Sequence, residues 1–169
     1  MQLPAIDLGI MAEHLSTHEG LINKLKVYYE LVNEPRIKRL IQVNINMLRN
    51  HVVTMLQLIN PDQSREVHLP ELPNIDTLFS PIVHLNENEK DITLELRSTA
   101  KWMGMENFNS ALMMKNNKVK NIHIMMAYQN VTMQSLYNKI EDIYGEFIPY
   151  SDAELQRLTF KKYYHVQNE

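Results

Sequence analysis

The sequence of 169 residues contains no cysteine, so disulfide bonds, thiolate metal sites and thiol nucleophiles are excluded. It contains only four glycines, and none of them stands in a G-x-G-x-x-G or G-x-x-x-x-G-K loop of the kind that binds phosphate groups. The sequence therefore gives no indication of nucleotide chemistry.

A surplus of charge is also missing, since the formal net charge is -3 and the isoelectric point is about 6.2. Proteins that bind nucleic acid or anionic lipid need clustered cationic side chains, so we expect neither partner. No apolar run approaches the ~18 residues of a membrane span, and the N-terminus lacks the pattern of a signal peptide. The composition, 44% hydrophobic and 22% charged, predicts one soluble, intracellular globular domain.

The seven prolines separate long segments whose apolar residues recur at alternating spacings of three and four, the period of a helix. This pattern predicts two helical hairpins, residues 7–59 and 88–148, joined by a crossover at 60–87. A short helix at 151–165 completes the single domain, 1–169.

Local signals at the turns mark where helices begin. In the first turn, "NEP", Asn33 is the expected N-cap, and the proline that follows suits a first helical turn. Near the C-terminus "SDAE" has the form of a capping box, with Ser151 as N-cap and Glu154 as its partner. The two hairpin turns also align, "NEPRIKRLIQ" with "KNNKVKNIHI", which places Ile37 opposite Val119 and suggests an internal duplication.

The crossover is unusual, because nearly thirty residues without helical periodicity rarely connect elements of a compact domain. Its natural role is to travel the length of a bundle, so that the second hairpin packs against the first. The sequence therefore predicts an all-α, ferritin-like four-helix bundle with one long crossover and a short C-terminal helix. In that topology the third helix, which begins at about Glu89, runs antiparallel to the first.

Several passages resemble a known family. These are an early "HE" in the first helix, a "K…YY…EP-R" passage into the next helix, the proline-rich crossover, the second hairpin and the tyrosine-rich tail. Together they resemble the spore coat protein F family of endospore-forming bacteria, whose members are ferritin-like bundles. The resemblance implies a structural, non-enzymatic protein that is synthesised in the cytoplasm of the mother cell and deposited in the spore coat. It also implies other spore coat proteins as partners, with a homodimer as a further candidate.

Ferritin-like bundles often hold two metal ions, bound by glutamates from two helices and by Glu-x-x-His from each of the other two. None of the seven histidines has a glutamate three residues before it. Without bridging carboxylates a di-iron oxidase or an iron store is not expected. We therefore expect no cofactor of that kind and no enzyme activity.

Polar residues nevertheless interrupt the apolar stripes at one level. His18 and His51 stand at similar distances from the first turn, at ~1.5 Å per residue. Glu106 and Gln129 reach nearly the same height from the second turn. This layer forms either a hydrogen-bonded network that fixes helix register or a remnant site for a single zinc or iron ion, with two imidazoles and one carboxylate as ligands. His14, one turn before the first of these histidines, is a neighbour of either arrangement.

The two interpretations of the layer imply different functions. A hydrogen-bonded network fits the structural coat protein. A metal site fits a metal-binding ferritin-like protein, acting as an oxidoreductase or a metal sensor. A helical dimerisation module, whose tyrosine and methionine side chains meet a partner, is a third alternative.

Overall fold

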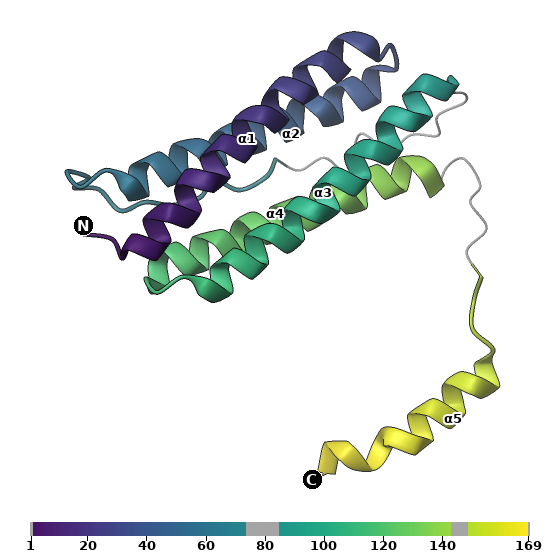
Figure 1. The fold of residues 1–169 in the computed structure, drawn as a ribbon. Helices are drawn as coiled ribbons and strands as arrows, with labels where there is room; N and C mark the ends of the chain where they lie inside the picture. Colours follow the sequence, from purple (N-terminus) through teal and green to yellow (C-terminus); the bar gives the residue numbers. More distant parts are fainter. Residues whose placement is uncertain (1, 74–84, 143–148, 169) are drawn as a thin grey trace.

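The computed structural model of this protein describes residues 2–73, 85–142 and 149–168, and these residues form helices without any strand (Figure 1). The all-α prediction is therefore confirmed for the described part of the chain. None of the described helices has a stretch apolar enough to cross a lipid bilayer. The helices are α1 (Ala5–Leu31), α2 (Pro35–Ile59), α3 (Glu87–Met113), α4 (Asn117–Asp142) and α5 (Ala153–Tyr163), the last followed by a 3₁₀ turn, η2 (Tyr164–Asn168).

The helices begin at side-chain caps that differ in part from the predicted ones. Glu34, and not Asn33, is the N-cap of α2, and its side chain accepts a hydrogen bond from the backbone N–H of Arg36. Asp152, and not Ser151, is the N-cap of α5. In both cases the true cap is the next residue along the chain, because a carboxylate there reaches the free N–H groups of the first turn.

The two hairpins exchange caps through buried carboxylates. Asp7, in the first turn of α1, accepts hydrogen bonds from the backbone N–H groups of Lys115 and Asn116, both at 2.8 Å, just before α4. Glu89, in the first turn of α3, accepts hydrogen bonds from the backbone N–H groups of Asn33 and Glu34, just before α2. Burial alone would raise the pKa of the Glu89 carboxyl, but its hydrogen bonds with backbone N–H groups lower this pKa below its ordinary value.

These contacts fix the direction of the helices. The start of α1 lies at the end of α3, and the end of α1 lies at the start of α3. The two helices therefore run antiparallel, as the sequence predicted, and Figure 1 shows them crossing the bundle in opposite directions.

The crossover follows the bundle over its described part. Val67 and Leu69 are buried against the end of the core that includes Met55 and Met126. The carbonyl of Pro70 accepts a hydrogen bond from the side chain of Gln129, near the middle of α4. Residues 61–73 of the predicted crossover thus lie along the bundle. The part of the crossover at 74–84 lies outside the described residues.

The core consists of two apolar clusters, one toward each end of the bundle. The first includes Val32 and Ile37 near the α1–α2 turn, and the second includes Met114 and Val119 near the α3–α4 turn. The same burial pattern occurs in both hairpins at a separation of 82 residues, which supports the suggested duplication. Such pairs of buried positions are Asp7 and Glu89, His18 and Ala100, Ile37 and Val119, His51 and Met133, and Leu58 and Ile140.

Candidate functional site

A layer of polar side chains separates the two apolar clusters, and every helix of the two hairpins contributes to it. Each of these side chains stands where the helical stripe would otherwise carry an apolar residue, so the fold of the bundle itself turns them inward. All are at most 8% exposed. The members of this polar layer are His14 and His18 from α1, His51 from α2, Ser110 from α3, and His123 and Gln129 from α4.

Three of the four side chains predicted for this layer meet. His18 Nε2 lies 3.3 Å from His51 Nδ1, and His51 Nε2 lies 2.8 Å from Gln129 Oε1. Gln129 in turn donates from Nε2 to the carbonyl of Pro70 at 2.8 Å. The chain of contacts thus runs from the interior of α1 across the bundle to the crossover.

The fourth predicted member, Glu106, lies outside the layer. It is half-buried, and no hydrogen bond within the described residues joins it to the histidines. The inward positions of α3 are instead Asn107 and Ser110, one and four residues further along. The prediction was wrong for Glu106, although Met103 and Ser110 on either side of it are buried as the helical period predicts. The inward residue between them is Asn107, a polar residue that a hydrophobic pattern does not mark. At Gly104 an added Cβ would lie 3.2 Å from Val131 Cγ2, so little room separates the two helices.

Two further histidines belong to the layer: His14, which was expected only as a neighbour of it, and His123, which was not predicted there. His14 Nε2 lies 2.9 Å from Ser110 Oγ, and the His14 and His123 ring centroids are 5.4 Å apart. His123 donates from Nδ1 to the carbonyl of Val119 at 2.9 Å. A helix inside a bundle buries a face wider than a single stripe of residues. His123 stands four residues before the buried Ala127, and this helical spacing would have predicted that His123 is buried too.

All four imidazoles of the layer are neutral at pH 7. Burial, the largest cause, lowers the pKa of His14, His18 and His123 to about 4 and that of His51 to about 3. The neighbouring imidazoles lower these pKa values further, because a proton on one ring disfavours a proton on the next. Each neutral ring carries one N–H and one lone pair, so its partners decide which nitrogen has the proton.

Backbone carbonyls fix the proton at each end of the His18–His51 pair. His18 Nδ1 lies 2.7 Å from the carbonyl of His14 and must donate to it. At the other end, Gln129 uses its N–H₂ group on the carbonyl of Pro70, so its oxygen faces His51 Nε2, which must therefore donate. The remaining nitrogens, His18 Nε2 and His51 Nδ1, are then both lone pairs and face each other at 3.3 Å.

Other polar atoms of this region also lack partners. His123 Nε2 carries a lone pair, since Nδ1 donates, and it has no hydrogen-bond partner among the described residues although the side chain is fully buried. The same part of the chain supplies no partner for His14 Nδ1 or Asn107 Oδ1. Within the described residues no three His, Asp or Glu side chains are arranged as a complete metal-binding group. His18 and His51 present lone pairs to each other, and the described residues supply no third ligand that would complete a metal site.

Gln129 connects the layer to the surface. It lines a groove of about 720 Å³ formed by α4 and the crossover. The wall on the crossover side includes Leu72, and the wall on the helix side includes Tyr128. The groove thus extends to the side chain that accepts the hydrogen bond of His51.

No protein-family model, curated protein or solved structure matches this chain. Membership of the spore coat protein F family and the ferritin-like assignment therefore stay predictions, which rest on the sequence passages that carry the resemblance and on the topology of the bundle.

Replacing Gln129 tests the hydrogen-bond chain without touching a histidine. We expect Gln129→Leu to lower the free energy of unfolding by about 2–4 kcal/mol, because it leaves the Pro70 carbonyl and the His51 N–H without partners. The matched variant Glu106→Ala should change it by less than about 0.5 kcal/mol, since that side chain lies outside the layer. Urea unfolding at pH 7 measures both, and equal effects of the two variants would contradict the chain described here.

Proposed function

We propose that this protein is a structural, non-enzymatic component of the bacterial spore coat, built as a ferritin-like bundle that assembles with other coat proteins. The resemblance of its "HE" and "EP-R" passages to the spore coat protein F family supports the proposal. The two antiparallel hairpins and the long crossover between them are the topology that ferritin-like folds with one crossover have.

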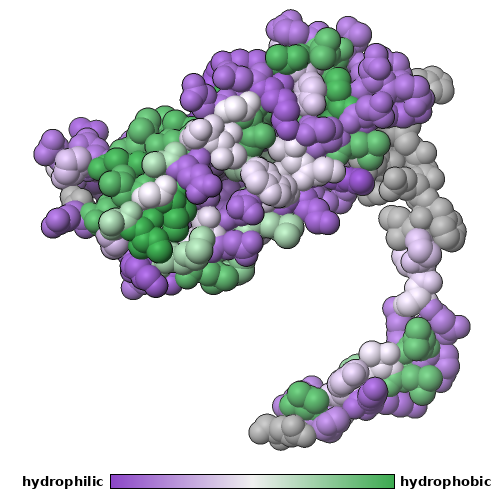
Figure 2. Space-filling model, viewed as in Figure 1, coloured by the Kyte–Doolittle hydropathy of each residue, from purple (hydrophilic) through white to green (hydrophobic). Residues whose placement is uncertain are grey.

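The observation that carries the proposal of an assembly role is an exposed apolar surface on the second hairpin. Met105, Phe108 and Leu112 follow one another along the outside of α3, and Leu112 is 62% exposed. The close approach of α3 and α4 at Gly104 sets this row beside a second exposed row on α4, which includes Tyr128. Figure 2 shows hydrophobic residues gathered over the end of the bundle where α1 begins and α3 ends.

We name this surface the outer apolar face. Contiguous apolar patches of this kind on a protein surface mark contacts with other proteins more often than they mark chance exposure. The members of the outer apolar face are Met105, Phe108 and Leu112 on α3 and Ile124, Tyr128 and Val131 on α4.

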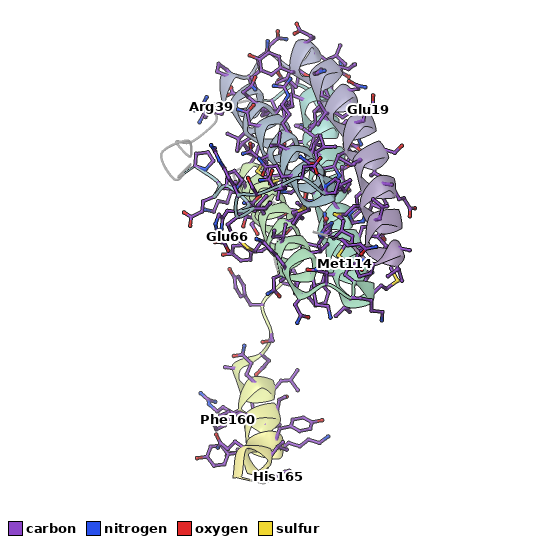
Figure 3. The ribbon with its side chains drawn as sticks, turned by 90° about the vertical axis from the view of Figure 1, so that its left-hand side faces the viewer. Glu19, Arg39, Glu66, Met114, Phe160 and His165 are labelled. Atoms are coloured by element: carbon purple, nitrogen blue, oxygen red, sulfur yellow. The ribbon has the colours of Figure 1, made fainter. Side chains whose placement is uncertain are left out.

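The C-terminal helix offers a second contact surface. No side chain of α5 is buried, although the helix carries Leu155, Leu158 and Phe160. Figure 3 shows Phe160 on α5 and His165 in the following turn η2, both away from the two hairpins. A helix that leaves such side chains exposed gains stability only when another surface covers them, and assembly into a coat would supply that surface.

Localisation tests the proposal. In a sporulating bacterium that expresses the chain as a fluorescent fusion, we expect fluorescence to move from the mother-cell cytoplasm to a ring around the forespore. The double variant Phe108→Lys/Tyr128→Lys should weaken this ring, because two charges would be placed in the outer apolar face.

The matched control is Asn109→Lys/Asn121→Lys, which adds the same charges to exposed polar positions on the same two helices. It should localise like the natural sequence, and circular dichroism should show both double variants to be helical and cooperatively folded. Fluorescence that stays in the mother-cell cytoplasm until lysis would overturn the coat assignment. Equal localisation of the two double variants would remove the outer apolar face as the contact surface.

A further inference from the structure

The groove between α4 and the crossover is open along most of α4. Its lining residues on that helix run from Ile124 to Lys139, which is ~22 Å at 1.5 Å per residue. Between them the wall includes Tyr128, which is 73% exposed, and the small side chain of Ser135. The volume of about 720 Å³ lies within the ~300–1,000 Å³ that binding pockets have. A groove of this length and volume can take one side of a helix.

The C-terminal helix α5 has a surface that such a groove would cover. Its charged residues Glu154, Arg157 and Lys161 recur at spacings of three and four, so they lie on one side of the helix. Apolar residues occupy much of the rest of its circumference, and Leu155 and Leu158 are neighbours there. All of these side chains are exposed. α5 is therefore an amphipathic helix whose apolar side is uncovered in a single copy of the chain.

We propose that the groove of one copy of this chain binds the apolar side of α5 from a second copy, so that two copies exchange their C-terminal helices. In a single copy the groove and α5 are both exposed, and Figure 1 shows α5 beyond the end of α4, away from the two hairpins. Each copy offers one groove and one helix, and a reciprocal exchange covers both in a closed two-fold dimer. The proposal rests on the assembly role proposed above for α5, and it names a second copy as the partner.

The lengths of the two surfaces match. α5 has 11 residues and spans ~16 Å, and the 3₁₀ turn η2 adds five residues at ~2.0 Å each. Together they extend over ~26 Å, which covers the ~22 Å of the groove. The groove offers the apolar side chains of Leu72, Met125 and Leu136 to those of the helix. Burial of apolar side chains on both sides supplies the driving force for the contact.

Charged residues favour one direction of the helix in the groove. The groove has Lys139 toward the end of α4, and Glu71 nearer its middle, at the level of Gln129. α5 carries Glu154 in its first turn and two lysines in its last turn. An α5 that runs antiparallel to α4 therefore brings opposite charges together at both places, whereas a parallel α5 brings like charges together.

The mass of the full chain in solution tests the proposal. By light scattering at increasing concentration we expect a dimer, with twice the 19.9 kDa of one chain. Ser135→Lys should raise the dissociation constant by about tenfold or more, because it places a charge in the groove that faces the apolar side of α5. Asn121→Lys is the matched control, since it adds the same charge to an exposed residue of α4 outside the groove lining. It should leave the dissociation constant unchanged, and circular dichroism should show both variants to be folded.

A disulfide shows which copy supplies the helix. The chain has no cysteine, so an introduced pair reports only its own contact. If the charges pair as described, Leu158 of α5 stands opposite Ser135 of α4, because both helices rise by the same amount per residue. On mild oxidation Ser135→Cys/Leu158→Cys should therefore form a disulfide between two chains, which peptide mapping identifies. Asn121→Cys/Leu158→Cys, whose first cysteine lies outside the groove, should not form one.

Four results would overturn the proposal. A chain that stays monomeric at every concentration, or a dimer that Ser135→Lys and Asn121→Lys weaken equally, would remove the groove as the contact. A disulfide within one chain would mean that α5 covers its own groove. A dimer that Phe108→Lys breaks and Ser135→Lys does not would be held by the outer apolar face. Because these results come from purified protein and localisation from sporulating cells, the exchange of helices and the coat function can fail independently.

Discussion

Acidification from pH 7 to pH 5, in the presence of a chelator, is expected to unfold this protein. The histidines of the polar layer have pKa values of about 3 to 4 when folded, against about 6.5 in the unfolded chain. Between those values the unfolded chain binds more protons than the folded one, so stability is complete above pH 6.5 and falls as the pH falls toward 4. Each such histidine contributes a slope of about 1.4 kcal/mol per pH unit.

The combined effect is large relative to the stability of a domain. Four imidazoles together give a slope of up to about 5 kcal/mol per pH unit, and a domain is stable by only about 5–15 kcal/mol. Urea unfolding followed by circular dichroism at pH 7, 6 and 5 measures this slope. Burial lowers the pKa of His123, and the charge of Asp7 raises it. The effect of burial is the larger, so the pKa of His123 is lowered overall.

Two variants separate the polar layer from other titrating groups. His123→Leu should reduce the slope by up to about 1.4 kcal/mol per pH unit and make the protein more resistant to acid than the natural sequence. His68→Ala, at an exposed histidine, should leave the slope unchanged. A stability that is flat between pH 7 and pH 5 would show that the imidazoles of the layer are not held neutral by burial.

The buried face of a helix could be predicted from the sequence where large apolar residues form that face. On α2 the apolar residues that recur at the helical period, from Ile37 to Leu58, are buried. On α3 apolar residues of that period such as Leu96 and Met103 are buried too, but so are Ala100, Gly104 and Asn107, which the period does not mark. Their burial follows from close packing of two helices, which leaves no mark in hydrophobicity.

The candidate site could be predicted in part for the same reason. Matched heights along the helices placed His18, His51 and Gln129 together, and their contacts agree. The tautomers could not be predicted, because they depend on the Pro70 carbonyl, which the crossover brings to α4. His123 was missed because it lies beside the main stripe of its helix rather than on it.

The two hairpins share a fold, and both contribute side chains to the polar layer, but from positions that do not correspond. The positions that correspond to His18 and His51 in the second hairpin are Ala100 and Met133, both apolar. Polar residues cost stability in a core, so a repeat that needed only to pack would carry apolar residues at both places. The first hairpin has histidines at these two positions, whereas the second hairpin has apolar residues there. This difference indicates a role for the polar layer beyond holding the two hairpins together.

The hydrogen bonds of Asp7 and Glu89 join the two hairpins in addition to the apolar core that they share, and removing them should have the second large effect. Asp7→Ala removes a buried carboxylate that accepts from the backbone N–H groups of Lys115 and Asn116 in a half-buried turn, and we expect it to lower the free energy of unfolding by about 1–3 kcal/mol. Glu89→Ala should do the same at the other end of the bundle.

The two substitutions should cost similar amounts, since the carboxylates occupy equivalent positions in the two hairpins and each accepts from two consecutive backbone N–H groups. Glu87→Ala is the matched control, because this carboxylate lies in the same turn of α3 but is exposed and pairs only with Lys90 at the surface. It should change stability by less than about 1 kcal/mol. If Asp7→Ala or Glu89→Ala lowered the free energy of unfolding as little as Glu87→Ala, water would replace the carboxylate as the acceptor for these N–H groups. The two hairpins would then be joined by their apolar contacts alone.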